Sequence, residues 1–136
     1  MTRQDLLLVG YVAAGGAIGS AVRYLLGAAI QSRAGAGFPL GTLLINITGS
    51  LLLGFLLRYA LETISITPEM RLFLTTGFCG GYTTFSTFSY ETARLIEDGD
   101  YTRAAWYVGL SVVVSLGGTF LGFSLARGLL SLREHV

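Results

Sequence analysis

Residues 77–91 read GFCGGYTTFSTFSYE, and this stretch interrupts a chain that is otherwise strongly apolar. It contains three glycines, Gly77, Gly80 and Gly81, followed by a run of Ser and Thr residues. Glycine lowers helix propensity, and Ser and Thr side chains compete for backbone hydrogen bonds. We therefore expect the helix that contains this stretch to be broken near Gly80–Thr83. Non-helical backbone at membrane depth persists only where protein buries it or where it lines a cavity, so the break marks a candidate site.

The composition is typical of a protein embedded in a lipid bilayer. Of 136 residues, 52% are hydrophobic and only 12% are charged, whereas an average soluble domain has roughly 25% charged residues. The net charge of +1 provides no basic surface for nucleic acid. Cys79 is the single cysteine, so it has neither a disulfide partner nor a cysteine cluster for a metal. The sequence shows no carboxylate pair and no nucleophile–base arrangement, so we do not expect an enzyme.

Four apolar segments predict the fold. They cover residues 6–30, 41–60, 72–95 and 104–130, and each is long enough to cross a hydrocarbon core of about 30 Å, which needs about 20 helical residues. Turn signals with Gly, Pro or acidic residues separate them. The sequence therefore predicts an all-α integral membrane protein in which residues 1–136 form a single four-helix transmembrane domain.

The arginines give little preference for one orientation in the membrane. The chain has nine arginines and no lysine, and alternating helices would place five on one side and four on the other. Because excess positive charge sets membrane orientation, this near balance favours insertion in both directions and an antiparallel dual-topology homodimer. The alternative is a single orientation, with one or two boundary arginines assigned to the wrong side. The arginines expected on one side are Arg3, Arg58, Arg71, Arg127 and Arg133, and those expected on the other side are Arg23, Arg33, Arg94 and Arg103.

Polar residues inside the second and fourth apolar segments need partners, because an unpaired polar group in hydrocarbon is costly. Asn46 lies in the middle of the second segment, and a helix–helix hydrogen bond is the simplest explanation for it. In the fourth segment Tyr107, Ser111 and Ser115 recur every four residues, which draws a ribbon of hydroxyls along one helix face. Serines in membrane helices often bond only to their own backbone. A ribbon that faces the bundle would instead offer O–H donors to a small anion or oxygen ligands to a cation.

Three further features of the sequence have a functional interpretation. Carbonyls freed by the break could hold a cation such as Na⁺. Phe85 and Phe88 share a helix face, where they either pack or turn their partly positive ring edges toward an anion. Arg23 lies 17 residues after Leu6, roughly 26 Å along a helix, so we expect it near the far interface. There it would either extend to the headgroups or attract anions into a vestibule.

At these positions the chain resembles the Fluc (CrcB) family of fluoride channels. The resemblance extends through all four helices, and its most specific part is GGYTTFSTFS with Asn46 upstream. The matching segments are GGAIGSAVRY (residues 15–24), GTLLINITGSLLLG (41–54), GFCGGYTTFSTFSYE (77–91) and the Tyr107, Ser111 and Ser115 ribbon. Tyr82 departs from the family, in which this position is often smaller and aliphatic.

The resemblance implies a passive, fluoride-selective channel in the inner membrane of a bacterium, which exports cytoplasmic fluoride and so relieves its toxicity. It implies an antiparallel dual-topology homodimer with a structural Na⁺ bound by the main-chain carbonyls of Gly80 and Thr83. It also implies that Arg23 lies in a vestibule. By the same resemblance the fluoride pathway comprises Asn46, Phe85, Phe88, Tyr107, Ser111 and Ser115.

Two other classes of protein fit parts of the sequence. A small dual-topology proton-coupled antiporter would have the same size and helix count, but it needs a carboxylate deep in the membrane. Glu91 is the single candidate, and it lies near the end of the third segment. A membrane scaffold without transport activity would explain the glycines but not the aligned hydroxyls.

Overall fold

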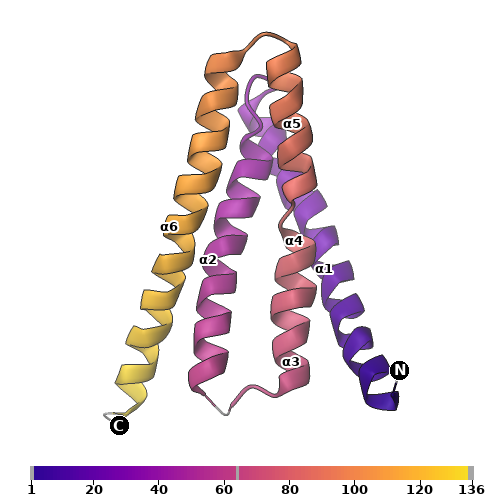
Figure 1. The fold of residues 1–136 in the computed structure, drawn as a ribbon, viewed down its shortest axis with the longest axis vertical. Helices are drawn as coiled ribbons and strands as arrows, with labels where there is room; N and C mark the ends of the chain where they lie inside the picture. Colours follow the sequence, from indigo (N-terminus) through magenta and orange to yellow (C-terminus); the bar gives the residue numbers. More distant parts are fainter. Residues whose placement is uncertain (1, 64, 135–136) are drawn as a thin grey trace.

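The computed structural model describes residues 2–63 and 65–134, which form helices joined by short turns (Figure 1). Two long helices come first, and a segmented third unit and a last long helix follow. The described residues contain no strand. The elements are α1 (Arg3–Ala34), α2 (Leu40–Glu62), α3 (Pro68–Leu72), the π-helix η1 (Phe73–Cys79), α4 (Gly80–Tyr82), α5 (Phe85–Glu97) and α6 (Tyr101–Glu134).

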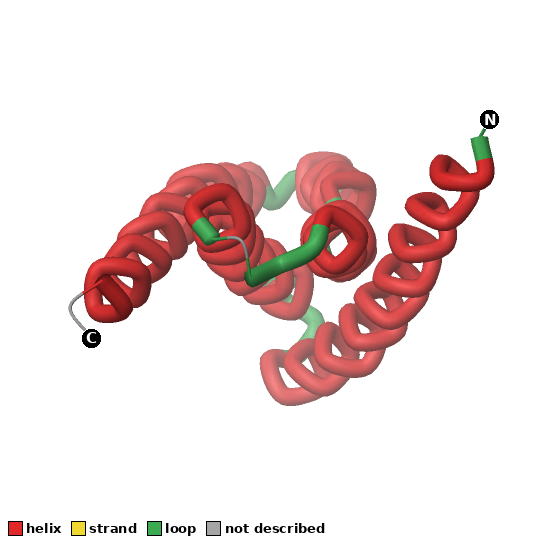
Figure 2. Tube along the Cα trace, turned by 90° about the horizontal axis from the view of Figure 1, so that it is seen from below, coloured by secondary structure: helices red, strands yellow, loops and turns green. Residues whose placement is uncertain are grey.

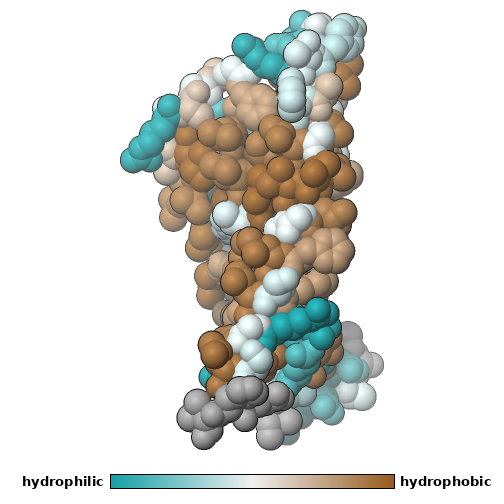
Figure 3. Space-filling model, turned by 90° about the vertical axis from the view of Figure 1, so that its left-hand side faces the viewer, coloured by the Kyte–Doolittle hydropathy of each residue, from teal (hydrophilic) through white to brown (hydrophobic). Residues whose placement is uncertain are grey.

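The structure confirms the all-helical fold with four transmembrane helices. Helices α1, α2 and α6 are each long and apolar enough to span a bilayer, and the stack from α3 to α5 forms the fourth, broken helix (Figure 1). Each helix extends a few residues beyond the range expected from the sequence. Apolar residues cover the middle of the face shown in Figure 3, whereas polar residues gather toward its two ends. This distribution is the one that a bilayer-spanning protein needs.

Local signals in the sequence begin and end the helices. The Thr2 side chain accepts a hydrogen bond from the Asp5 N–H, and the Asp5 side chain accepts one from the Thr2 N–H, so α1 begins with a capping box. Gly35 ends α1 with a positive φ of 80°, a conformation that favours glycine. Thr67 caps α3 through the Met70 N–H. Short turns join the helices, and successive helices alternate in direction. Both termini therefore lie at the same end of the bundle (Figure 1).

The third helix is broken at the end of the predicted range, Gly80–Thr83. Gly80–Tyr82 is still helical, whereas Thr83 (ψ 159°) and Thr84 (φ −152°, ψ 114°) are extended. The glycines therefore do not unwind the helix. Gly77 and Gly81 allow it to approach α1 instead, because a Cβ on Gly77 would lie only 2.9 Å from the Val12 carbonyl oxygen.

Close helix packing positions the break inside the bundle. Helix α2 packs along α6, and α1 packs against η1 and α4. A Cβ on Gly54 of α2 would lie 2.5 Å from the Thr119 carbonyl oxygen of α6, so this glycine is needed for the contact. Near its N-terminus α1 diverges from the other helices (Figure 2). The tight contacts next to the break are with α1 and α2, and the side of Phe85 stays exposed.

Candidate functional site

Asn46 binds the backbone of the break with both ends of its side-chain amide. Its Nδ2 donates to the Thr84 carbonyl at 3.1 Å, and its Oδ1 accepts from the Thr84 N–H at 2.8 Å. Helix α2 therefore supplies the acceptor that the Thr84 N–H would otherwise find within its own helix, and it adds a donor to the Thr84 carbonyl. An Asn amide has two N–H donors, so one N–H of Asn46 remains for another acceptor.

The break redirects the N–H groups that would normally bond to two backbone carbonyls. In an α-helix the N–H of Thr84 would bond to Gly80 and that of Thr87 to Thr83, because each N–H pairs with the carbonyl four residues earlier. Here Thr84 donates to Asn46, and the Thr87 N–H donates to the Thr84 hydroxyl at 3.2 Å. Gly80 and Thr83 are the residues expected to bind Na⁺, and carbonyl oxygens suit hard cations. A Cβ on Gly80 would meet no atom within 4 Å, so its surroundings are open.

Helix α1 holds the opposite side of the break. The Gly81 carbonyl accepts from Arg23 Nε at 3.0 Å and from the Ser20 hydroxyl at 3.3 Å. Arg23 therefore lies at the level of the break, and the expectation that it reaches the far interface is wrong. The sequence position gave only a distance along α1, whereas the hydrogen bond to Gly81 fixes where the side chain points.

A cavity of about 260 Å³ joins the break to α2 and α6. Two serine hydroxyls on its α6 side, those of Ser111 and Ser115, are buried and have no hydrogen-bond partner among the described residues. The sequence left open that these serines bond only to the backbone of their own helix. In the structure they make no such hydrogen bond. A buried polar group without a partner is costly, so both hydroxyls remain for a ligand. The predicted residues that line this cavity are Asn46, Thr83, Phe85, Phe88, Ser111 and Ser115.

Tyr107 does not line this cavity, although the sequence places it in the same ribbon. Its side chain is fully buried, and its ring packs against Phe88 with centroids 5.3 Å apart. The hydroxyl donates to Glu91 Oε2 at 2.6 Å. The ribbon is therefore divided, because its two serines line the cavity at the break whereas Tyr107 bonds to a carboxylate on α5.

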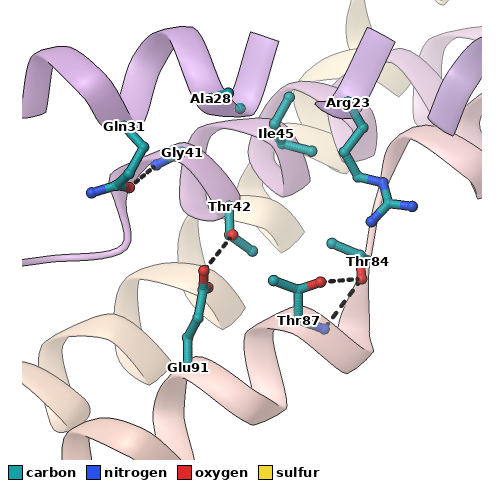
Figure 4. A pocket seen from close by; sticks show the side chains of 10 residues that line it. Arg23, Ala28, Gln31, Gly41, Thr42, Ile45, Thr84, Thr87 and Glu91 are labelled. Carbon is teal, nitrogen blue, oxygen red and sulfur yellow. Dashed lines mark hydrogen bonds between the residues drawn. The ribbon is translucent and has the colours of Figure 1, made fainter. Parts of the chain in front are cut away.

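A second cavity of about 240 Å³ lies between α1, α2 and α5 (Figure 4). Thr42 and Glu91 point toward each other across it, and the Thr42 hydroxyl donates to Glu91 Oε1 at 2.9 Å. Arg23 and Thr87 also line this space, and Thr84 lines both cavities. The sequence interpretation did not include Thr42, Thr84, Thr87 or Glu91 among the site residues. The signals for them were weak: Thr42 is one turn before Asn46, and Glu91 is two turns after the break.

Phe85 stands at the edge of the first cavity and is strongly exposed. Its exposed fraction is 78%, and its ring centroid lies 5.5 Å from that of Phe88. Phe88 in turn contacts Tyr107. The two phenylalanines therefore connect the surface of the protein with its buried polar residues.

The fold and the site define a class of protein: a multi-pass helical membrane protein whose polar groups converge on a helix break within the bundle. The chain belongs to the family described as CrcB-like protein, Camphor Resistance (CrcB), which matches residues 10–123. The sequence-based recognition of this family is therefore confirmed.

Curated relatives cover most of this chain and nearly all of their own length. A protein of Geobacter metallireducens is 48% identical over 91% of this chain and 100% of its own, and one of Rhizobium meliloti is 47% identical over 91% and 97%. A protein of Chlorobaculum tepidum is 47% identical over 93% and 98%. Each of the three is named a fluoride-specific ion channel FluC. Because these relatives are ion channels, the prediction that the chain is not an enzyme is confirmed.

Proposed function

We propose that this protein is a passive, fluoride-selective channel that exports fluoride from the cytoplasm and so relieves its toxicity. The observation that carries the proposal is the cavity beside the break, where two buried serine hydroxyls have no partner among the residues that the structure describes. The names of the relatives supply the identity of the ion. Neutral HF enters cells from acidic surroundings and dissociates inside, and a membrane potential that is negative inside drives the anion out by about 2.3 kcal/mol per charge per 100 mV.

The selectivity of the channel would come from replacing water around the bare anion. Fluoride is small and strongly hydrated, so its passage requires donors at short intervals. The free N–H of Asn46 and the hydroxyls of Ser111 and Ser115 line one cavity and supply such donors. The ring edges of Phe85 and Phe88 are partly positive and add weaker contacts. Arg23 and the hydroxyl of Thr42 line the neighbouring cavity, which would serve as the vestibule.

The proposal includes a structural Na⁺ bound by the carbonyls of Gly80 and Thr83. Support comes from the hydrogen bonding of the break, because Asn46 and the Thr84 hydroxyl take the N–H groups that would otherwise bond to these carbonyls. A bound cation would fix the carbonyls in place and add positive charge near an anion path.

The proposal also includes an antiparallel, dual-topology homodimer in a bacterial inner membrane. Exposed Phe85 and the open surroundings of Gly80 lie on the surface beside the break, where a second protomer would cover them. Five arginines belong to one end of the bundle and three to the other, because Arg23 lies at the level of the break. This difference of two gives only a weak preference for one orientation.

A proton-coupled antiporter is the alternative, and one observation favours it. The Glu91 carboxylate is partly buried and accepts hydrogen bonds from Tyr107 and Thr42, so a carboxylate does lie within the helical bundle. Both neighbours donate to it, so two side chains from other helices hold the carboxylate in place.

Efflux from liposomes separates the two functions. We expect purified protein in liposomes to release fluoride rapidly, as measured with a fluoride electrode, while chloride release stays at the level of protein-free liposomes. Release should proceed at equal pH on both sides. Fluoride release that requires a proton gradient, or no release from well-inserted protein, would contradict the channel.

A further inference from the structure

Tyr82 is the last helical residue before the break, and its buried side chain reaches α2. Its exposed fraction is only 6%, and its hydroxyl lies 2.9 Å from the Thr48 hydroxyl oxygen. Its ring stacks on Phe78 with centroids 5.9 Å apart and planes 8° apart. Gly49 of α2 makes room for the ring, since a Cβ there would lie 3.0 Å from Tyr82 Cδ1.

The direction of this hydrogen bond follows from the other contacts of Thr48. Its hydroxyl lies 2.7 Å from the Leu44 carbonyl and 3.2 Å from the Ile45 carbonyl, both of which only accept. A hydroxyl has one proton, so Thr48 donates to its own helix and accepts from Tyr82. The Tyr82 hydroxyl is therefore a buried donor whose partner is Thr48.

This contact lies beside the hydrogen bonds that hold the break. Thr48 is two residues after Asn46 on α2, and Tyr82 is two residues before Thr84. Helix α2 thus forms hydrogen bonds with the chain on both sides of Thr83, at Tyr82 and at Thr84. A single attachment would let this segment pivot, whereas two attachments fix the direction in which the Thr83 carbonyl points.

We propose that Tyr82 is a positioning residue that sets the geometry of the break through its hydrogen bond to Thr48. The Asn46 amide holds Thr84, and the Tyr82 hydroxyl holds the helix end that precedes it. The consequence for conduction rests on the proposed function, since a displaced break moves Phe85, Thr84 and Thr83, which all line the cavity with Ser111.

Substitutions at the two positions have distinguishable effects. Tyr82→Phe keeps the ring stacked on Phe78 and leaves no buried donor unpaired, because Thr48 still donates to Leu44. Thr48→Val leaves the buried Tyr82 hydroxyl without an acceptor, which costs more than losing one hydrogen bond. We therefore expect Tyr82→Phe to slow fluoride efflux about threefold to tenfold, the scale of one hydrogen bond, and Thr48→Val to slow it further.

The double variant Tyr82→Phe/Thr48→Val provides the decisive comparison. It removes both the donor and its acceptor, so its efflux should return to the rate of Tyr82→Phe alone. Thr48→Ser keeps the hydroxyl and should behave like the wild type. Tyr24→Phe removes a hydroxyl from a side chain that is 75% exposed, and it serves as the control. If the double variant is slower than Thr48→Val, the two side chains act independently and the proposal is wrong.

Hydrogen–deuterium exchange tests the positioning without reference to transport. Backbone amides of residues 83–88 should exchange faster in Tyr82→Phe than in the wild type and in Tyr24→Phe. If wild-type protein releases no fluoride but exchange still rises in Tyr82→Phe, the proposed function fails and the positioning role stands. If the wild type conducts while Tyr82→Phe matches it in both efflux and exchange, the positioning role is excluded.

Discussion

At the scale of single residues, the site depends on which polar groups have protein partners and which do not. Asn46 bonds to the backbone of Thr84 and retains one N–H. Ser111 and Ser115 have buried hydroxyls with no partner in the part of the chain that the structure describes. The bonded amide of Asn46 stabilises the break, whereas the two serine hydroxyls are available to bind an ion.

Replacing an unpaired serine should therefore affect transport and stability differently. Ser111→Ala removes a buried hydroxyl that has no protein partner, so thermal stability should stay the same or rise. Fluoride efflux should fall at least about tenfold, because a charged acceptor loses a donor worth about 1.5–3 kcal/mol. Thr75→Val is the matched control, since Thr75 is also buried but bonds to the Arg71 carbonyl at 2.8 Å. Unchanged efflux in Ser111→Ala would contradict its place on the pathway.

Asn46→Asp changes charge with almost no change in shape. The aspartate lacks the Nδ2 donor to the Thr84 carbonyl and adds negative charge beside the cavity. We expect efflux to fall by at least about two orders of magnitude, since like charges repel strongly in a medium of low dielectric. Asn46→Ala removes both the donor and the Oδ1 acceptor of the Thr84 N–H but adds no charge, and it should be less severe. Equal efflux in the wild type and Asn46→Asp would show that Asn46 only joins two helices.

At the scale of helices, glycines shape the molecule by permitting close contact. A Cβ on Gly54 would lie 2.5 Å from the backbone of Thr119, so α2 and α6 could not keep their separation. Gly109 of α6 faces open space, since a Cβ there would meet no atom within 4 Å. The contact between α2 and α6 therefore requires glycine at position 54, whereas position 109 has room for a larger residue.

The corresponding prediction compares two alanine substitutions. Gly54→Ala should lower the free energy of unfolding by about 1–3 kcal/mol, as overpacking does. Gly109→Ala should raise it by about 0.5–1 kcal/mol, because alanine is the better helix residue. Thermal unfolding in detergent measures both. Equal stability of the two variants would mean that α2 and α6 are not packed as described.

The sequence predicts the helices well because apolar length and turn signals are local properties. It predicts a break in the third helix near Gly80–Thr83, and the extended residues, Thr83 and Thr84, lie at the end of that range. The true position depends on Asn46, which is 38 residues away and takes the Thr84 N–H. The partners of Glu91 are equally non-local, since Thr42 and Tyr107 come from two other helices. Without the fold, neither contact can be derived from spacing.

At the scale of the whole molecule, the bundle exposes the region of the break on one protomer. Phe85 is 78% exposed although it lines the cavity beside Ser111. An ion pathway must be enclosed by protein on all sides. In the proposed dimer, a second copy of the chain would cover this surface. The near balance of arginines at the two ends is what an antiparallel arrangement requires.

Orientation in the cell tests this arrangement. A tag after the C-terminus should be reached by impermeant reagents from both sides of the membrane, because copies insert in both directions. Adding two arginines to the loop at residues 35–37 would equalise the ends at five each and should leave labelling two-sided. Adding two near Arg3 should bias labelling to one side and reduce efflux. One-sided labelling of the original chain would contradict dual topology.

The central claim is that protein donors replace water around a bare anion that moves passively along its own gradient. Current across a planar bilayer measures this most directly, with a tenfold fluoride gradient and equal chloride and pH on both sides. The account predicts a current that reverses about 59 mV from zero, with the sign set by fluoride. A reversal near zero under the fluoride gradient, or one that follows an imposed chloride or proton gradient, would contradict it.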